Sequence, residues 1–284
     1  AGWVVSNESF FEDLKPMFSN MKFRASYGSL GNGNIKPYRY LEQMGVSKSS
    51  VILNGVLGNY TRLPEVIPEG LTWERSTTVN FGADLGFFQN RLNVTFDWYT
   101  RMTYDMFTVG QPLPGVFGAA VPHGNYADLS TKGWELTANY NNQFMLAGKA
   151  FSWGINGSIW DSRSTIERFN NPNKLLSAYY VGQELNEIWG YQTEGFFTSD
   201  ADVAQHANQS FIKNSNNNIW LAGDLKFADL NGDGLINQGD NTLDNPGDRK
   251  VIGNSSPRYQ YGFTLSGSWS GIGVSAFFQG IGKR

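Results

Sequence analysis

Apolar and polar residues alternate along several segments of this chain. In residues 77–86, Val79, Phe81, Ala83 and Leu85 occupy one side, and polar residues and glycines occupy the other. Successive side chains of a β-strand point to opposite faces, so this pattern predicts a strand with one apolar and one polar face. The same alternation appears in residues 21–27, 92–99, 134–140, 151–159, 259–266 and 272–278.

The lengths of these segments and of their connections favour a membrane β-barrel. Each segment is about 9 to 11 residues long, which is the length a tilted strand needs to cross a bilayer. Short turns are predicted at 87–90, 141–148 and 268–271, alternating with long links over 30–75, 102–132 and 163–257. Short turns on one rim and long loops on the other are typical of outer-membrane barrels. The alternative is a soluble sheet protein, although compact domains rarely contain structureless loops of this length.

In a barrel, the two faces of the clearest strands have different surroundings. The apolar set is expected to face lipid: Val79, Phe81, Ala83, Leu85, Leu92, Val94, Phe96 and Trp98. The polar set is expected to face the lumen: Asn80, Asp84, Asn93, Asp97, Glu135, Asn139 and Asn156. Polar residues of a lumen can contact cargo or a plug, or can simply form a solvated wall.

Composition narrows the choice of protein class. The chain has 284 residues, a net charge of −3 and no cysteine, so disulfides, thiolate metal sites and electrostatic binding of nucleic acid are not expected. It contains no apolar run of about 18 residues, the length of a membrane helix. Its aromatic fraction of 15% fits girdles at two membrane interfaces, and also a carbohydrate-binding β-sandwich. Both ends look cut from a longer barrel.

Several motifs occur in the order found in one transporter family. They are Met21–Asn32, Leu71–Arg75 with Val79–Leu92, Asp97–Met106, Lys132–Leu136, Trp189–Phe197, Gly223–Gly234 and Asp248–Asn254 with Pro257. In these segments the chain resembles the SusC/RagA family of TonB-dependent outer-membrane transporters from Bacteroidetes.

The resemblance implies an all-β fold, a segment of a large antiparallel transmembrane β-barrel with long extracellular loops. Residues 1–284 would be part of the barrel domain of a multi-pass protein of the bacterial outer membrane. The family barrel has about 22 strands around a plug. Neither the plug, the TonB-contacting parts nor the last strands are recognisable in this sequence. The resemblance further implies import of oligosaccharides, energised by TonB and assisted by a SusD-like surface lipoprotein. Import of oligopeptides is the alternative within the family.

One loop has the spacing of a calcium ligand set. Its candidate ligands are Asp229, Asn231, Asp233, the Leu235 carbonyl and Asp240, at loop positions 1, 3, 5, 7 and 12 around a Gly turn. Ca²⁺ held there would be structural, and the side chain of Ile236 would anchor the loop. The alternative is a metal-free turn, because Asn, Asp and Gly favour turns on their own.

Aromatic residues of the longest link are the candidates for cargo contact. The candidate cargo-binding residues are Trp189, Tyr191 and Trp220, because aromatic rings stack on sugar rings. Packing in a small loop core, or against the lipoprotein, is the favoured alternative, since Trp189 lies inside a family motif.

No enzyme is predicted. His123 and His206 lie in separate links, and the chain shows no nucleophile elbow, phosphate loop or dinucleotide fingerprint. Glu74 and Asp97 could be paired as hydrolase carboxylates, but Glu74 fits a structural role at a strand start better. A soluble calcium-stabilised glycan-binding protein and a secreted β-rich hydrolase remain the alternatives to the importer.

Overall fold

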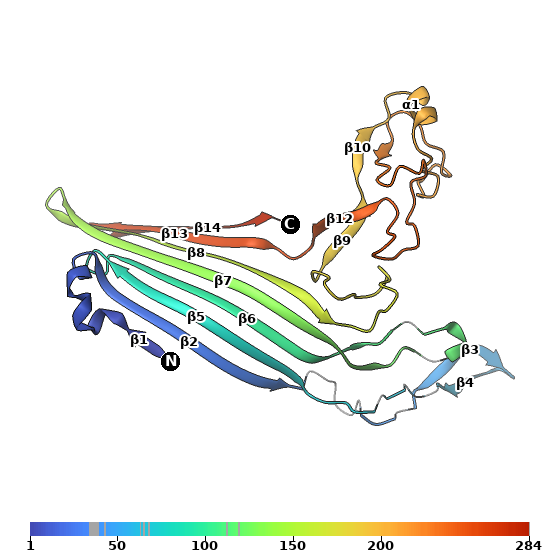
Figure 1. The fold of residues 1–284 in the computed structure, drawn as a ribbon, viewed down its shortest axis with the longest axis horizontal. Coiled ribbons are helices and arrows are strands. Elements are labelled where there is room, and N and C mark those ends of the chain that lie inside the picture. Colours follow the sequence, from blue (N-terminus) through green and yellow to red (C-terminus); the bar gives the residue numbers. More distant parts are fainter. Residues whose placement is uncertain are drawn as a thin grey trace.

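The computed structural model describes residues 1–284 apart from 34–39, 43, 63, 65, 68, 112, 119 and 284. Its main feature is a curved sheet of eight antiparallel strands in the order β1-β2-β5-β6-β7-β8-β13-β14 (Figure 1). Their bounds are β1 (Gly2–Val4), β2 (Phe18–Asn32), β5 (Glu74–Phe87), β6 (Leu92–Val109), β7 (His123–Leu146), β8 (Lys149–Arg168), β13 (Arg258–Trp269) and β14 (Ile272–Lys283). Sequence neighbours on either side of each short turn are also neighbours in the sheet, as in an up-and-down barrel wall.

The short connections all lie at one end of the sheet (Figure 1). Ala147 and Gly148 join β7 to β8, and Ser270 and Gly271 join β13 to β14. Both residues of each pair have positive φ, as two-residue hairpin turns that match the strand twist require. The 3₁₀ turns η1 (Val5–Asn7) and η2 (Ser9–Leu14) link β1 to β2 at the same end. The predicted separation of short turns from long loops is therefore confirmed.

The strands are longer than the alternation predicted, and the loops are correspondingly shorter. β7 has 24 residues and β8 has 20, against the expected length of about 10. The predicted link 102–132 was wrong over most of its length, since β6 continues to Val109 and β7 begins at His123. The predicted turn 141–148 shrinks to two residues for the same reason. Polar residues can continue a hydrogen-bonded strand beyond its amphipathic part, so alternation alone underestimates the strand length.

The register places each predicted face on one side of the sheet. Phe81 is opposite Trp98, and Trp98 is opposite Trp134, so the apolar sets of β5, β6 and β7 form common rows. Asp97 is opposite Glu135 in the intervening polar row, and Asn139 is opposite Asn156. The alternation therefore predicted correctly which residues share a face.

The apolar face of the sheet is largely uncovered. Phe81 is 53% exposed, and Phe96 and Trp98 are each 41% exposed. In the described part of the chain, the sheet strands contact mainly their hydrogen-bonded neighbours, and no second sheet or helix packs extensively on this face. None of the helices among the described residues is long and apolar enough to cross a membrane.

The link between β8 and β13 folds into a small structure of its own (Figure 1). It contains two short sheets, β9 (Glu187–Tyr191) with β12 (Arg249–Asn254) and β10 (Thr193–Phe196) with β11 (Leu225–Phe227). Helix α1 (Asp200–Gln205) follows β10, and the Ser199 side chain caps it by accepting a hydrogen bond from the Asp202 N–H. A compact core forms around Phe197 and Ile236, which are 2% and 0% exposed. The link is therefore an ordered region, named here the loop region (residues 169–257).

A second excursion, between β2 and β5, carries a separate hairpin. It consists of β3 (Val46–Leu53) and β4 (Val56–Thr61), which meet at Asn54 and Gly55, both with positive φ. The 3₁₀ turn η3 (Gly115–Phe117) lies in the link between β6 and β7.

A polar network ties the loop-bearing ends of the strands together. Glu74 is 8% exposed; its carboxylate accepts a hydrogen bond from the Phe107 N–H at 3.0 Å and another from Asn32 Nδ2 at 3.3 Å. Arg168 on β8 contacts Asp128 at 2.7 Å and Asp105 at 2.8 Å. Glu74 thus has the structural role at the start of β5 that the sequence favoured, and it is not part of a hydrolase pair with Asp97.

Candidate functional site

The polar face of the sheet carries a charged cluster on β2, β5 and β6. Arg24 lies opposite Gly82, and Gly82 lies opposite Asp97. The Arg24 guanidinium donates to Asp84 at 2.9 Å and to Asp97 at 2.8 Å. A Cβ on Gly82 would lie only 2.6 Å from the Asp97 carboxylate and 2.7 Å from the Arg24 guanidinium, so the glycine leaves the space that the ion pairs occupy. Two of the three predicted lumen carboxylates therefore share one cation, Arg24, which the sequence did not single out.

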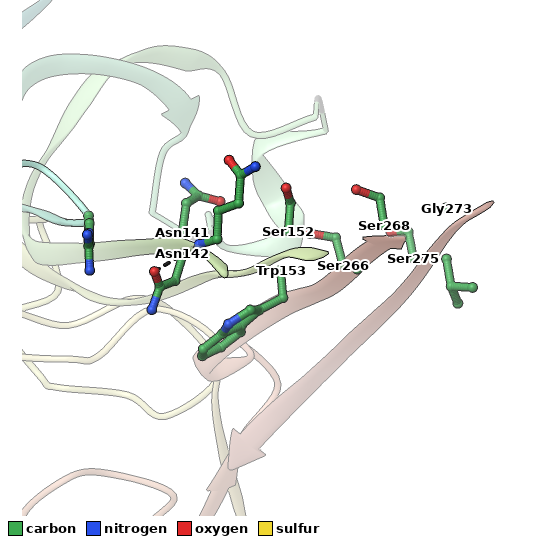
Figure 2. Close-up of a pocket in the computed structure, with 12 residues that line it drawn as sticks. Asn141, Asn142, Ser152, Trp153, Ser266, Ser268, Gly273 and Ser275 are labelled. Atoms are coloured by element: carbon green, nitrogen blue, oxygen red, sulfur yellow. Dashed lines mark hydrogen bonds between the residues drawn. The ribbon is translucent and has the colours of Figure 1, made fainter. Parts of the chain in front are cut away.

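The same face is hollowed near the short turns of β7, β8, β13 and β14 (Figure 2). The hollow has a volume of about 630 Å³, and small polar side chains form most of its wall: Asn141, Gln143, Ser152, Ser266, Ser268 and Ser275. The figure shows the serine side chains on adjacent strands at one end of the hollow and the asparagines at the other. Short hydroxyl and amide side chains leave room and hydrogen-bonding groups, which suits a wall that borders water or another polar surface.

The Asp229 loop is ordered by hydrogen bonds within the chain. The two carboxylate oxygens of Asp229 accept from the Gly232 and Gly234 N–H groups at 2.7 and 2.8 Å. The Gly234 amide, followed by the Gly232 amide, holds the pKa of the Asp229 carboxyl below its usual value. Asp233 accepts from the Leu235 N–H at 2.8 Å, and Asn231 accepts from the Asp233 N–H at 3.0 Å. These contacts are those of successive Asx turns.

A buried carboxylate that the sequence did not predict holds the loop from inside. Asp248 is 0% exposed, and its two oxygens accept from the Leu230 N–H at 2.9 Å and the Asn237 N–H at 2.8 Å. Ile236 is also 0% exposed, as the loop spacing predicted for its anchoring side chain. Asp248 lies outside the spacing of the calcium pattern, so only its place in the Asp248–Asn254 motif pointed to it.

Calcium binding stays a prediction. Asp240, the last candidate ligand, accepts from Asn245 Nδ2 at 2.8 Å. Within the described residues, no group of three or more His, Asp or Glu side chains has an arrangement that could hold a metal ion. A bound ion would have to turn the side chains of Asp233 and Asp240 toward Asp229 and use the Leu235 carbonyl, because Ca²⁺ takes six or more oxygen ligands.

Calorimetric titration of the intact protein with Ca²⁺ tests this prediction. The expected result is one bound ion, with a Kd on the order of 10⁻⁴ to 10⁻³ M as in extracellular modules. Asp229→Ala should abolish binding. Asp244→Ala is the matched control in the same region, since Asp244 is exposed and pairs only with Lys174. Heats that are equal in wild type and in Asp229→Ala would rule the site out.

The three candidate cargo residues are half-buried in the loop region, and each contacts other residues of that region. Trp189 Nε1 donates to Glu187 at 2.8 Å, and the Tyr180 hydroxyl donates to the same carboxylate. Burial, together with the Glu187 hydrogen bond, raises the pKa of Tyr180 to about 12. Tyr191 and Trp220 both lie against Phe227. Their ring centroids are 5.9 and 6.3 Å, respectively, from the centroid of the Phe227 ring. The favoured packing role therefore agrees with the structure, and cargo contact stays a prediction.

The two histidines lie in different parts of the structure and make different contacts. His206 Nε2 lies 2.8 Å from the Phe227 carbonyl, at the end of α1. His123 stacks on Phe107 with ring centroids 5.8 Å apart. Each therefore has a local packing or hydrogen-bonding role, in line with the prediction that they do not form one site.

No family model matches the chain. Curated relatives do. TonB-dependent receptor P3 of Formosa agariphila is 26% identical over 294 residues, which cover 98% of this chain and 27% of the relative. TonB-dependent receptor P39 of the same organism is 28% identical over 300 residues, covering 98% and 28%. TonB-dependent receptor SusC of Bacteroides thetaiotaomicron is 26% identical over 251 residues, covering 84% and 23%. The chain thus spans about a quarter of the length of these relatives.

Solved structures show the same fold. The RagAB peptide transporter matches with a TM-score of 0.69 at 18% identity, over 98% of this chain and 28% of that one. The RagAB peptide importer in its open-open state matches with a TM-score of 0.66, over 99% and 27%. The relatives are named as receptors and transporters, and this confirms the prediction that the chain is not an enzyme. Over nearly its whole length the chain is therefore similar to TonB-dependent receptors, over 84% of its length also to SusC, and its sheet has the fold of part of the RagAB transporter.

Proposed function

We propose that the chain forms part of the barrel wall of an outer-membrane transporter that imports nutrients with energy from TonB. The observation that carries this proposal is the sheet itself, with one uncovered apolar face and one polar face. A water-soluble protein with so large an exposed apolar surface would aggregate or bind a partner, whereas lipid covers such a face in a membrane barrel. The homology to TonB-dependent receptors supports the same function.

The two ends of the sheet then have different surroundings. The short turns 88–91, 147–148 and 270–271 face the periplasm, and the excursions 33–73, 110–122 and 169–257 face the outside. The polar face lines the lumen, where the hollow near the short turns borders water or a plug. The polar network around Glu74 and Arg168 fixes the strand ends from which the outer loops leave.

The partner we propose is a SusD-like surface lipoprotein that covers the outer loops. Apolar side chains are exposed on the loop region, among them Phe196, Ile219 and Leu221. Exposed apolar groups on a rim favour a protein partner, and a lid that opens needs contacts that can be broken. TonB is the second proposed partner, as the source of energy for import.

Oligosaccharides are the proposed cargo, supported by the aromatic side chains of the loop region. Oligopeptides are the second candidate, and a specific observation favours them: the solved structures with this fold are named as peptide transporters. Sugar rings stack on aromatic faces, whereas an extended peptide needs backbone donors and acceptors.

Uptake by intact cells tests the function and separates the two cargoes. Deleting the gene should abolish uptake of labelled oligosaccharides and leave uptake of labelled oligopeptides unchanged; the opposite result would assign the peptide role. A cysteine at Gln205 should react with an impermeant label in living cells, and one at Gln89, in the short turn 88–91, should not. The lipoprotein should co-purify in mild detergent. Unchanged uptake of both cargoes would contradict the proposed function.

A further inference from the structure

Two like charges lie at the edge of the apolar face that is nearest to the loop-bearing end of the sheet. Lys132 on β7 is directly opposite Arg163 on β8. The row below pairs Trp134 with Asp161, and the next pairs Leu136 with Ile159. Lys132 and Arg163 therefore lie on the apolar face, one row beyond its aromatic residues. Like charges directly opposite on neighbouring strands repel each other, so the pair destabilises the sheet unless an anion lies between them.

Asp161 and Glu184, two of the carboxylates near this pair, bind Arg258. Asp161 is bound by the Arg258 guanidinium, and the Tyr259 N–H also donates to it at 3.3 Å. Glu184 lies 3.5 Å from Arg258. Within the described residues, no carboxylate is close enough to Lys132 or Arg163 to form an ion pair, although Glu167 borders the same hollow on its loop side. Both cations are exposed.

The two cations border a hollow of about 410 Å³ that also includes Trp98, Trp134 and Tyr259. Trp98 and Tyr259 are each 41% exposed. Tryptophan and tyrosine concentrate where hydrocarbon meets headgroups, and cations placed just beyond them reach the headgroup phosphates. The lining thus combines aromatic rings with three cations and two carboxylates, Asp161 and Glu167, so that cations outnumber anions by one.

We propose that this hollow binds the phosphate of an anionic membrane lipid in the leaflet next to the long loops. The proposal rests on the proposed membrane barrel. Arg163 donates two parallel hydrogen bonds to phosphate oxygens, and Lys132 adds a point charge from the neighbouring strand. The acyl chains run down the apolar rows past Leu136 and Phe96. The bound anion removes the repulsion between the two cations, so the lipid stabilises the sheet as well as anchoring it.

Native mass spectrometry of the intact protein tests this site. The protein is released from mixed micelles that contain phosphatidylglycerol or phosphatidylcholine as the probe lipid. Wild type should retain phosphatidylglycerol in preference to phosphatidylcholine. Replacing both cations with glutamine (Lys132→Gln with Arg163→Gln) should weaken retention of phosphatidylglycerol about thirtyfold, since each cation near a lipid surface contributes about a factor of five. Millimolar inorganic phosphate should not displace the lipid.

Two control variants separate this site from general charge effects. Lys22→Gln with Arg101→Gln removes the same charge from the opposite, polar face and should leave lipid retention unchanged. Exchanging the cations, Lys132→Arg with Arg163→Lys, keeps both charges and should retain the lipid, which also guards against a folding defect. Equal retention of the two lipids by wild type, or equal losses in both glutamine variants, would overturn the site. A protein that stays in water without detergent would instead overturn the membrane barrel itself.

Discussion

Replacing Arg258 with alanine is expected to destabilise the sheet by about 3 to 5 kcal/mol, the usual cost of removing one partner from a buried ion pair. The Arg258 and Asp161 side chains are 10% and 7% exposed, and two guanidinium nitrogens donate to the two carboxylate oxygens. Without Arg258, the Asp161 charge stays buried with only the Tyr259 N–H as a donor. Urea unfolding in detergent, followed by tryptophan fluorescence, measures the change.

A matched set of variants shows whether the loss comes from the pair. Arg168→Ala is the control, because the Arg168 side chain is 45% exposed. This variant should lower the free energy of unfolding clearly less than Arg258→Ala does. Replacing both partners, Arg258→Met with Asp161→Leu, should restore much of the lost stability, since an apolar pair leaves no unpaired charge. If the double variant is no more stable than Arg258→Ala, the buried charge is not the cause.

Phe96→Arg is expected to lower the free energy of unfolding in a bilayer by about 2 to 4 kcal/mol, the cost of a lipid-facing arginine near the midplane of a barrel. Phe96 lies between Ala83 and Leu136 in an apolar row and is 41% exposed. The polar-face control is Thr137→Arg, which should change stability by about 0.5 kcal/mol or less because that side chain borders water. Folding into lipid vesicles at increasing urea concentration measures both. Equal costs at the two positions would contradict a lipid-facing Phe96.

The sequence predicted correctly which residues share a face of the sheet, but it did not predict where the strands end. A two-residue period assigns every side chain to a face without reference to the rest of the fold, so the rows through Phe81, Trp98 and Trp134 were correct. The ends of β6 and β7 were not predicted, because hydrogen bonds to neighbouring strands continue there without an apolar pattern. The loop region was predicted as an excursion without its two short sheets, since its strands are too short to show a period.

For the candidate sites too, local features were predicted from the sequence, and contacts between distant residues were not. The spacing of Asp229, Asn231 and Asp233 correctly indicated a tight Asx-rich loop with Ile236 as its anchor. The pairing of Arg258 with Asp161, and of Arg24 with Asp84 and Asp97, could not be predicted from the sequence. These residues are far apart in the chain and meet only through the strand order. Asp248 was not predicted as the buried acceptor for Leu230 and Asn237, because it lies outside the spacing of the calcium pattern.

By itself, the sequence determined a β-rich chain with one apolar and one polar face, short turns at one end, and a likeness to SusC-type receptors. These features are local, because they depend on residue spacing and short motifs. Only the tertiary structure decided which charges neutralise each other and which are left facing outward. Lys132 and Arg163 become a pair through the β7–β8 register, and Asp161 in the next row forms its ion pair with Arg258. The physical reason is that electrostatic contacts depend on distances across strands, and the register sets those distances.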